Sequence, residues 1–446
     1  MTRRLPIVLL AFAAHASAKP FAIEVIDADT KRPIPLIRLE TVNNIVEYTD
    51  NTGFVAIDEP GLMGQEVWFS ISGPGYEMKA DGFGNRGTRL KPVADGQAMI
   101  EMKRINIAIR IQRLTGQGRY VHGARLGMIL PGEKPNLNAQ VLGCDSVDTA
   151  IFQGRMFWLW GDTNRPGYPL GNFHTTLATT VLPGEIGCDP DRSIDYQYFQ
   201  AEDGFVKEIA RFPGDGPTWL GALVTLKDKS GNEHLGATYS KIKKPMNASE
   251  RGLCEFDPVT KEFKKVLTFP DGTKLFPDGH AFRDGTSLYF GQATPALRIN
   301  DDYESWKNPA NYKELKCDVA FTDASSGKPV KPHNGSISWN PWRKKWISIF
   351  SEEGGTSYLG EIRYAEAPTP EGPWRRSVKI VTHDHYTFYN PLQHPEFATD
   401  GGQVIWFEGT YTATFSGNNN PTPRYDYNQI IYKLDLANPR LGDAQK

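Results

Sequence analysis

The sequence predicts an all-β protein in which a five-bladed β-propeller follows a small β-sandwich. The chain has 446 residues, more than the roughly 100–200 of one ordinary domain. It contains 43 glycines and 32 prolines, as many short strands and tight turns require, together with 10 Trp, 18 Tyr and 23 Phe. A strand–turn–strand unit rich in aromatic residues also recurs along the second two-thirds of the chain, which is typical of a repeat architecture.

Composition and charge exclude several classes of protein. Apolar residues make up 39% of the chain and charged residues 23%, which is typical of a globular protein and not of a disordered one. Lys and Arg number 50 against 52 Asp and Glu, so the basic excess of a nucleic-acid binder is missing. No apolar run reaches the roughly 18 residues of a membrane span. We therefore expect no nucleic-acid partner, no membrane anchor and a monomer.

The first 18 residues have the pattern of a secretory signal. Two arginines precede an apolar stretch over 5–14, and Ala16 and Ala18 place small residues before a cleavage site. An apolar stretch of about ten residues is too short to remain as an anchor. We expect residues 1–18 to be removed and the mature protein to be secreted or periplasmic.

Four cysteines remain in the expected mature chain. An even number in an exported protein permits two disulfides, in three connectivities. The alternative is that they are buried free thiols. The spacing contains no C-x-x-C pair, so it indicates neither a zinc site nor a redox motif. The four residues are Cys144, Cys188, Cys254 and Cys317.

Residues 19–104 predict a separate β module. Short apolar runs alternate with turn-forming residues, as in Asp-Asn-Thr-Gly at 50–53 and Ser-Gly-Pro-Gly at 72–75. The order of these runs, VIDADTKRPIPLIRLETVNNIVEYTDNTGFVAI, resembles the transthyretin-like or carboxypeptidase-regulatory-like β-sandwich. The resemblance implies an appended module without chemistry of its own. We expect residues 105–134 to form a linker or a blade-closing strand.

The recurring unit occupies residues 135–437. Each copy begins with polar residues, continues as an apolar strand, turns at Gly, Asp or Pro, and returns as a strand rich in aromatic side chains. Successive copies start roughly 55–75 residues apart, which is the chain length that a four-stranded blade with long loops needs. Five copies predict five blades, and residues 438–446 remain as a polar tail. The copies cover 144–163, 218–240, 276–293, 333–355 and 393–412.

Polar residues at the start of each copy are expected to meet. In a propeller the first strand of every blade lines a central channel, so these residues should converge on one channel mouth. Counting back from the hairpin turns places Asp145 opposite Asp162 or Thr163, and His394 opposite Glu408, with Cβ atoms about 5 Å apart. The residues expected at this mouth are Asp145, Asp148, Trp219, Asp278, His280, His333, Asn334, His394 and Glu396.

Convergent acids are what glycoside hydrolysis requires. One carboxylic acid protonates the leaving oxygen, and a second carboxylate activates water or attacks the anomeric carbon. Two carboxylates at short range resist ionising together, which raises the pKa of one of them. Asp145 and Asp162 are the first candidate pair because one hairpin brings them together. Asp148, Asp278 and Glu408 are further candidate catalytic acids. The competing interpretation of each is a turn or a solvated strand end.

Other residues in the copies suit sugar binding. Trp160 and Trp219 are candidates to stack on a sugar ring, although strand aromatics also pack between blades. Arg424 is a candidate to bind an anionic sugar. Imidazoles from neighbouring blades also suit a divalent cation in the channel, although their spacing matches no metal motif, and no other cofactor is indicated. The remaining candidates for substrate contact are His280, His333, His394 and Glu396.

Three segments carry a resemblance to a known family. They read DSVDTAIFQGRMFWLWGDT, GEIRYAEAPTPEGPW and YNPLQHPEFATDGGQVIWFEGTYT. Through them, residues 135–437 resemble the five-bladed propeller glycoside hydrolases of the arabinanase, β-xylosidase and neoagarobiose-hydrolase groups, with most similarity to the endo-D-arabinanase-like propellers. The resemblance implies that Asp145 or Asp148, together with Asp162, is catalytic. It departs at the middle blade, where the xylosidase group has a general-acid Glu and this chain has Asp278.

The residues and the resemblance predict a secreted glycoside hydrolase that acts on a polysaccharide or oligosaccharide. The first alternative is a polysaccharide lyase, in which a His or Tyr removes the proton α to a uronate carboxylate and a metal or Arg neutralises that carboxylate. The second alternative is a non-catalytic carbohydrate-binding propeller. The near-neutral charge favours a neutral or weakly acidic glycan over a heavily sulfated one. The residues available to a lyase are His280, His333, His394, Tyr411, Tyr427 and Arg424.

Overall fold

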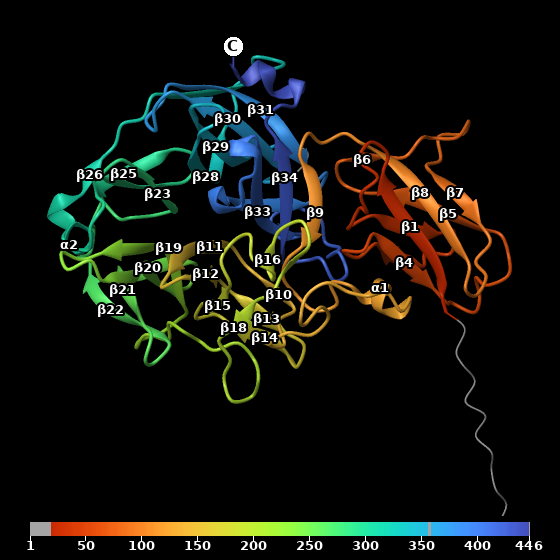
Figure 1. Ribbon diagram of the computed structural model, residues 1–446, viewed down its shortest axis with the longest axis horizontal. Helices are drawn as coiled ribbons and strands as arrows, with labels where there is room; N and C mark the ends of the chain where they lie inside the picture. The colour runs from red at the N-terminus through yellow and green to blue at the C-terminus, as the bar shows by residue number, and fades with distance from the viewer. Residues whose placement is uncertain (1–18, 356–357, 446) are drawn as a thin grey trace, which may run out of the picture.

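The chain folds into two parts that lie side by side. The computed structural model describes residues 19–355 and 358–445, so the expected secretory signal, residues 1–18, lies outside the described residues. The described chain is nearly all-β. Its N-terminal part, red to orange in Figure 1, stands beside a larger ring of sheets formed by the rest of the chain. The second part is therefore propeller-like in its arrangement.

Two four-stranded sheets make up the N-terminal part. The strands are β1 (Phe21–Asp27), β2 (Arg38–Thr41), β3 (Val46–Tyr48), β4 (Phe54–Ile57), β5 (Val67–Ser72), β6 (Tyr76–Glu77), β7 (Gly87–Leu90) and β8 (Gln97–Arg104). The sheet orders are β4-β1-β8-β6 and β3-β2-β5-β7. Ile23 of one sheet and Phe69 of the other belong to the same buried cluster, because alternate side chains of each strand point inward. The two sheets therefore share one core.

Five further sheets form the ring. The first contains β11 (Val147–Phe152), β12 (Arg155–Trp160), β15 (Thr176–Thr180) and β18 (Gln197–Tyr198). The second contains β19 (Thr218–Lys227), β20 (Glu233–Lys243), β21 (Asn247–Asp257) and β22 (Glu262–Thr268). The third contains β23 (His280–Asp284), β24 (Ser287–Gly291), β25 (Pro295–Asn300) and β26 (Lys313–Glu314). The strands of these three sheets pair in the order in which they occur along the chain.

The fourth and fifth sheets each contain a strand from elsewhere in the chain. The fourth consists of β28 (Pro332–Asn340), β29 (Lys345–Glu352), β30 (Glu361–Ala367), β31 (Trp374–Thr382) and, at its outer edge, β27 (Val319–Asp323). The fifth consists of β32 (Thr387–Gln393), β33 (Val404–Thr412), β34 (Asn428–Asp435) and β9 (Ile109–Arg113). The segment 105–134, expected to be a linker or a closing strand, thus supplies the outer strand of the fifth sheet.

Smaller elements occupy the connections. They are the strands β10 (Gly143–Cys144), β13 (Thr163–Arg165), β14 (Tyr168–Asn172), β16 (Cys188–Asp189) and β17 (Ser193–Ile194), the α-helices α1 (Val121–Arg125) and α2 (Tyr303–Lys307), and the 3-10 helices η1 (Pro309–Asn311), η2 (Pro395–Phe397), η3 (Asp400–Gly402) and η4 (Pro439–Gln445). None of the helices within the described ranges has the length and apolar character that crossing a membrane requires.

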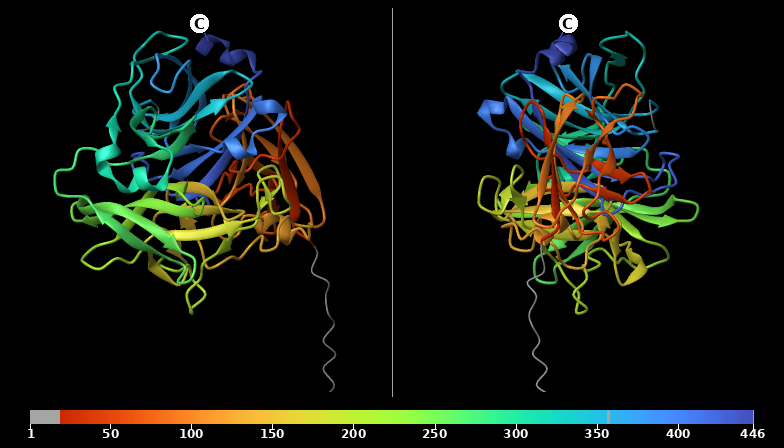
Figure 2. Two further views of the ribbon diagram at one scale, coloured as in Figure 1. Left: turned by 60° about the vertical axis from the view of Figure 1, so that its left-hand side comes forward. Right: turned by 90° about the vertical axis from the view of Figure 1, so that its right-hand side faces the viewer.

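The first strands of the five sheets surround the centre of the ring. β11, β19, β23, β28 and β32 each lie next to the following one, and β32 also lies next to β11. β9 pairs with β34, with Arg113 opposite Ile430, so chain segments more than 300 residues apart share one sheet. In the right-hand view of Figure 2, the N-terminal part faces the viewer and the ring lies behind it. The first strands are thus positioned to present their ends at the two mouths of a central channel.

The fifth sheet corrects one prediction. The sequence predicts that the last copy of the recurring unit starts at residue 393, but β32 ends there and η2 follows it. The sequence pattern does not identify β32 as a strand, because it contains Pro391 and a proline inside an apolar run argues against a strand assignment. The structure accommodates this proline at a bulge of the β32–β33 pairing. As a consequence, His394 and Glu396 follow the end of their channel strand, whereas Asp145 precedes the start of its own.

Cysteines and C-terminal residues both belong to the packed interior. All four cysteines are free, and Cys144, Cys188 and Cys254 are buried while Cys317 is half-buried. The buried-thiol alternative therefore holds, and the disulfide alternative is wrong.

The C-terminal segment is packed against the ring. Residues 438–446 are not simply a polar tail, since Leu441 of η4 is fully buried in the same cluster as side chains from strands of the fourth and fifth sheets.

Buried hydrogen bonds fasten the N-terminal part to the ring. Arg110 of β9, only 2% exposed, donates from Nε to the carbonyl oxygen of Pro35 (3.0 Å) and from Nη1 to that of Pro74 (2.8 Å). The Asn51 side chain accepts from the backbone N–H of Arg113 (2.9 Å) and donates to its carbonyl oxygen (2.8 Å). Because these groups are shielded from water, the two parts hold a fixed relative position.

Candidate active site

Polar side chains meet where the channel strands begin. Asn334, at the start of β28, donates to the side chain of Asn390 at 2.6 Å, and Asn390 in turn donates to Ser146, just before β11. Trp219 of β19 reaches the same region, where it donates to Asp162. Starts of four of the five channel strands therefore converge, and we call this end of the channel the acid mouth.

Asp145 is held by four hydrogen bonds. The Tyr389 hydroxyl donates to its Oδ1 at 2.5 Å, and the Tyr427 hydroxyl donates to its Oδ2 at 2.9 Å. The backbone N–H and the hydroxyl of Ser146 both donate to Oδ1, at 2.5 and 2.8 Å. The residue is half-buried. The carboxylate is thus oriented by donors from three chain segments while part of it faces solvent.

Asp162 lies beside Asp145, as the hairpin prediction requires. The backbone N–H of Asp145 donates to the carbonyl oxygen of Asp162 at 2.8 Å. The indole N–H of Trp219 donates to Oδ1 of Asp162 at 3.0 Å. Burial raises the pKa of Asp162 to about 7, the negative charge of Asp145 adds to the rise, and the Trp219 hydrogen bond opposes it. Near neutral pH the carboxyl group of Asp162 therefore exists in both protonation states.

Gly161 permits this close approach. A Cβ atom at this position would lie 3.1 Å from Cβ of Asp145 and 3.5 Å from its Cγ. Since heavy atoms rarely pack that closely, any side chain at 161 would push Asp145 away from the Asp162 strand end. The small residue before Asp162 is thus a local sequence requirement for pairing the two acids.

We expect Trp219→Phe to raise the pKa of Asp162 above about 7. Phenylalanine keeps most of the burial that raises this pKa but lacks the N–H group that lowers it. If Asp162 must be protonated to act, the alkaline limb of the pH profile of kcat/KM moves to higher pH in the variant. A titration of ¹³C-labelled aspartate carboxyl groups by NMR measures the same shift without turnover. An alkaline limb that stays in place or moves to lower pH would contradict the assignment.

Asp148 and His280 pair with each other deeper in the channel. Oδ1 of Asp148 lies 3.3 Å from Nδ1 of His280, and Oδ2 accepts from the backbone N–H of Leu223 at 2.8 Å. Both residues line a cavity of about 430 Å³ that all five channel strands border. Within the described chain, no hydrogen bond or ion pair joins either residue to Asp145 or Asp162. Asp148 is therefore separate from the acid pair.

Glu408 and His394 also meet, but they do so inside the protein. Nε2 of His394 lies 2.8 Å from Oε1 of Glu408, and its Nδ1 lies 3.2 Å from Oε1 of Glu396. The side chains of His394 and Glu408 are both 0% exposed. Backbone pairing places Leu392, not His394, opposite Glu408, so the expected register is wrong although the side chains still touch. Neither His394 nor Glu408 can reach a glycan, and Glu408 is excluded as a catalytic acid.

Trp160 is a core residue and not a stacking platform. Its side chain is 0% exposed and its ring lies 4.9 Å from that of Tyr196, edge to face. It also lies parallel to Trp158 at 6.3 Å. Successive residues of β12 alternate between the two faces of a sheet that is covered on both sides, so no face of the strand is open to solvent. The prediction that Trp160 binds sugar is wrong.

Three other candidates lie around the acid pair without contacting it. Asp278 is exposed just before β23. His333 is half-buried at the start of β28, its ring 6.5 Å from that of Tyr358, and burial lowers its pKa. Arg424 forms an ion pair with Glu47 of the N-terminal part at 3.5 Å, so it is committed to the junction of the two parts. Of the residues predicted to converge, the structure brings Asp145, Asp162 and Trp219 together, and it joins Asn334 to the same mouth through Asn390.

The histidines do not form a metal centre. His280 is paired with Asp148, both ring nitrogens of His394 face carboxylates, and His333 belongs to a different strand start. The described ranges contain no group of three or more His, Cys, Asp or Glu side chains that could hold a metal ion. The residues therefore do not fit the divalent cation considered for the channel.

Sequence reasoning missed two of the residues that define the acid mouth. Tyr389 and Asn390 lie on β32, the strand that Pro391 concealed. Tyr427 precedes β34, and the sequence predicts a role for it only as a residue of a lyase, not as a hydrogen-bond donor to Asp145. A signal for the first two did exist, since an aromatic and an amide residue directly precede the proline of a short apolar run. Tyr389 contacts Asp145 and Asn390 contacts Ser146, in each case across 244 positions of the chain, so neither contact could be read from local spacing.

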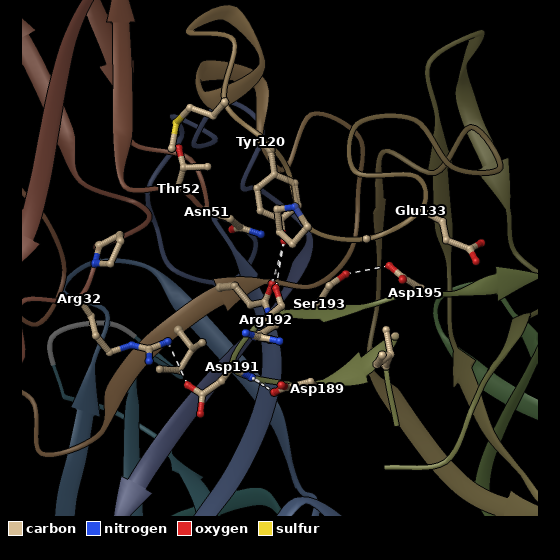
Figure 3. Close-up of a pocket in the computed structure, with 18 of the residues that line it drawn as sticks. Arg32, Asn51, Thr52, Tyr120, Glu133, Asp189, Asp191, Arg192, Ser193 and Asp195 are labelled. Atoms are coloured by element: carbon tan, nitrogen blue, oxygen red, sulfur yellow. Dashed lines mark hydrogen bonds and ion pairs between the residues drawn. The ribbon is translucent and has the colours of Figure 1, made fainter. Parts of the chain in front are cut away.

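A larger cavity, of about 1070 Å³, lies at the junction between the N-terminal part, β9 and the segment that carries β16 and β17 (Figure 3). The aspartates that line it are engaged in hydrogen bonds or ion pairs. Asp191 pairs with Arg32 at 3.0 Å and with Lys433 at 2.8 Å, and Asp195 accepts from the Ser193 hydroxyl at 2.8 Å. None of the acid-mouth residues lines this cavity. The paired acids of the mouth, rather than this cavity, are therefore the candidate active site.

Comparisons with known proteins give structural neighbours only. No family model matches the chain, and no curated protein matches it. Similar solved structures are an exo-β-1,3-galactanase from Phanerochaete chrysosporium (10% identity, 70% of this chain and 64% of that chain, TM-score 0.42) and an exo-1,5-α-L-arabinanase from a bovine ruminal metagenomic library (11%, 67% and 94%, 0.39). A third is an α-L-arabinofuranosidase from Podospora anserina (10%, 68% and 93%, 0.37). These neighbours are glycoside hydrolases, but with TM-scores below 0.5 the likeness carries no weight in assigning a function, which rests on the site.

Proposed function

We propose that the protein is a secreted glycoside hydrolase that cleaves a polysaccharide or oligosaccharide at the acid mouth of a five-bladed propeller. The five sheets of the ring are the five blades, the two N-terminal sheets form a β-sandwich, and residues 1–18 direct export. The observation that carries the proposal is the pair of adjacent carboxyl groups, Asp145 and Asp162, in which the pKa of one is raised to about 7. A carboxyl group that keeps its proton near neutral pH beside a second carboxyl group is what acid-catalysed glycosidic cleavage needs.

Asp162 is the proton donor in this proposal. With a pKa near 7, a substantial fraction of it carries a proton at neutral pH, and that proton can pass to the glycosidic oxygen as the bond to the anomeric carbon breaks. Trp219 holds the carboxyl group through its indole N–H and offers its ring as one wall for a sugar. The donor is therefore both positioned and partly shielded from water.

Asp145 is the partner that acts at the anomeric carbon. It either accepts a proton from the attacking water or bonds to the carbon itself. The hydroxyl groups of Tyr389 and Tyr427 fix both of its oxygens and limit its motion to the productive orientation. The Asp145 carboxylate also remains beside Asp162, where its charge keeps the donor protonated to a higher pH.

The geometry favours hydrolysis over a lyase reaction. The hydroxyl groups of Tyr389 and Tyr427 are donors to a carboxylate, and burial, with the charge of Asp145, raises the pKa of both. A tyrosine whose pKa is raised is a poor base for removing a proton from carbon. His394, another lyase candidate, is enclosed by two carboxylates away from solvent. Two of the residues named for a lyase, Tyr427 and His394, are therefore not available as bases.

A digestion panel tests the proposal. The purified protein is incubated with soluble arabinan, galactan, arabinoxylan and a uronate polymer, and products are followed by reducing-end assay and mass analysis. We expect new reducing ends from at least one of these glycans, with products that have gained one water. Products that absorb in the near ultraviolet would indicate elimination and overturn the hydrolase assignment. Binding without any turnover would instead support the carbohydrate-binding alternative.

A further inference from the structure

A second cavity, of about 730 Å³, opens at the junction of the N-terminal part and the fifth sheet. Arg38 and Tyr48 of the N-terminal part lie on one side of it. Tyr386 and the loop over 418–423, both from the ring, lie on the other. The cavity thus draws its lining from two parts of the chain that fold around separate cores.

The wall on the ring side is well ordered by its own contacts. The ring of Tyr386 stacks on that of Tyr411 at 5.1 Å and an angle of 24°. The Tyr386 hydroxyl donates to the carbonyl oxygen of Asn420 at 2.9 Å, and the Tyr411 hydroxyl shares a hydrogen bond of 2.9 Å with Thr422. Two prolines in the same loop further restrict its backbone. The loop therefore has a defined shape before anything binds.

The wall formed by the N-terminal part is held in a fixed position relative to the ring-side wall. The Tyr425 hydroxyl donates to the carbonyl oxygen of Thr49 at 2.7 Å and accepts from the backbone N–H of Leu36 at 3.1 Å. Arg424 adds the ion pair with Glu47. These contacts immediately flank the strands that carry Arg38 and Tyr48. Because both walls are already in place, a ligand can bind in the cavity without a loss of conformational entropy from ordering them.

One loop connects this cavity with the acid mouth. The segment between β33 and β34, residues 413–427, packs Phe415 edge-on against Tyr389 at 6.2 Å and ends with Tyr427, which donates to Asp145. The middle of the same segment lines the junction cavity. Phe415 is 63% exposed, so it presents an apolar side chain to solvent beside Tyr389. The mouth and the cavity are therefore neighbours along one surface loop.

The chemistry of the cavity suits sugar rings. Half-buried tyrosine rings offer apolar faces with polar edges, and the amide of Asn418 and the guanidinium of Arg38 offer hydrogen-bond donors. Pockets that bind small polar molecules combine such surfaces. We propose that the junction cavity binds further sugar units of the glycan chain whose scissile bond lies at Asp145 and Asp162. This inference rests on the proposed function and gives the N-terminal part a role in holding a polymeric substrate.

Binding alone tests the inference. The Asp162→Asn protein serves as the parent, so that turnover does not remove the ligand, and its migration is measured in native gels that contain soluble arabinan, galactan or arabinoxylan. We expect Arg38→Ala and Tyr386→Ala, each added to this parent, to reduce by at least about fivefold the extent to which the polymer slows the migration of the protein. Asn418→Ala provides a third variant that does not disturb the Tyr386–Tyr411 stack.

Arg89→Ala is the matched control. Arg89 lies on β7, in the same sheet as Arg38, but it packs over Trp68 and does not line the cavity. Its loss removes the same charge from the same sheet and should leave retardation at the parent value. Equal retardation of all variants, or no retardation of the parent by any of the three polymers, would overturn the inference. Selective loss of binding, when the protein with Asp162 intact hydrolyses nothing on the panel, would keep the cavity as a glycan-binding site but reject the proposed function and the link to a scissile bond.

Discussion

Asp162→Asn lowers kcat for glycan hydrolysis by roughly 10²–10⁴-fold, because asparagine keeps the size of the side chain but has no proton to transfer. Asp145→Asn is expected to reduce kcat to a similar extent, since an amide neither attacks carbon nor accepts a proton from water. Because the two acids have different roles, their substitutions should affect different substrates to different extents. A substrate whose leaving group is 4-nitrophenolate needs little protonation, so it should be cleaved far better by Asp162→Asn than by Asp145→Asn. Initial rates on both kinds of substrate measure this difference.

Asp278→Asn is the matched control for these two variants. Asp278 is an exposed acid before β23, and within the described residues it has no hydrogen bond or ion pair with Asp145 or Asp162. Its replacement should leave kcat within about twofold of the parent value, as for a surface substitution. Thermal unfolding of all three variants should occur near the temperature of the parent. Activity at the parent level in both Asp145→Asn and Asp162→Asn would contradict the proposed function.

The second large effect concerns stability. Glu408→Gln should cost about 3–5 kcal/mol of unfolding free energy, because it leaves the imidazolium of His394 in a fully buried site without its closest counter-charge. Burial alone would lower the pKa of His394, but its hydrogen bonds to Glu396 and Glu408 and their charges raise it to about 9. Urea unfolding at pH 6.5, followed by tryptophan fluorescence, measures the loss. Glu396→Gln is the control, since Glu396 is partly exposed and its loss should cost less.

The same pair makes stability depend on pH in a defined direction. The pKa of His394 is higher in the folded protein than its unperturbed value of about 6.5. Its stabilising contribution is therefore complete below about pH 6.5 and is lost as the pH rises through about 9. The gap in unfolding free energy between the parent and Glu408→Gln should accordingly narrow over this range. A gap that widens with rising pH would show that His394 is not held as the cation.

Much of the fold was predictable because its signals are local. Alternating apolar runs and turn residues predict strands, and their recurrence at similar intervals predicts repeated sheets. The Asp145–Asp162 approach was predictable for the same reason, since both residues belong to one hairpin with a short turn. Gly161 reinforces that approach with its lack of a side chain. The strands, their turns and the Asp145–Asp162 approach each depend on residues close together in the sequence.

The errors arose where packing or register overrides local pattern. Trp160 and Glu408 both occupy hairpin strands that the sequence identifies, yet both side chains are fully buried. Burial depends on which neighbouring sheet covers a strand face, and local alternation does not contain that information. His394 was misplaced because Pro391 disguised the strand before it, which moved the expected start of the fifth unit by about one strand. A shift of that size changes which end of the channel a residue faces.

By itself, the sequence determined the all-β class, the repeated hairpins and the pairing of two acids within one of them, because turn chemistry and the two-residue period of strands act over short distances. Only the tertiary structure decided that Tyr389 and Tyr427 would orient Asp145, that Trp219 would hold Asp162, and that His394 would be buried against Glu408. The contacts of Asp145 and Asp162 join residues from different sheets, whereas His394 and Glu408 belong to one hairpin whose burial depends on the neighbouring sheets. These contacts exist because the ring closes, and closing it brings distant strand ends to one mouth and covers side chains that the local pattern leaves open.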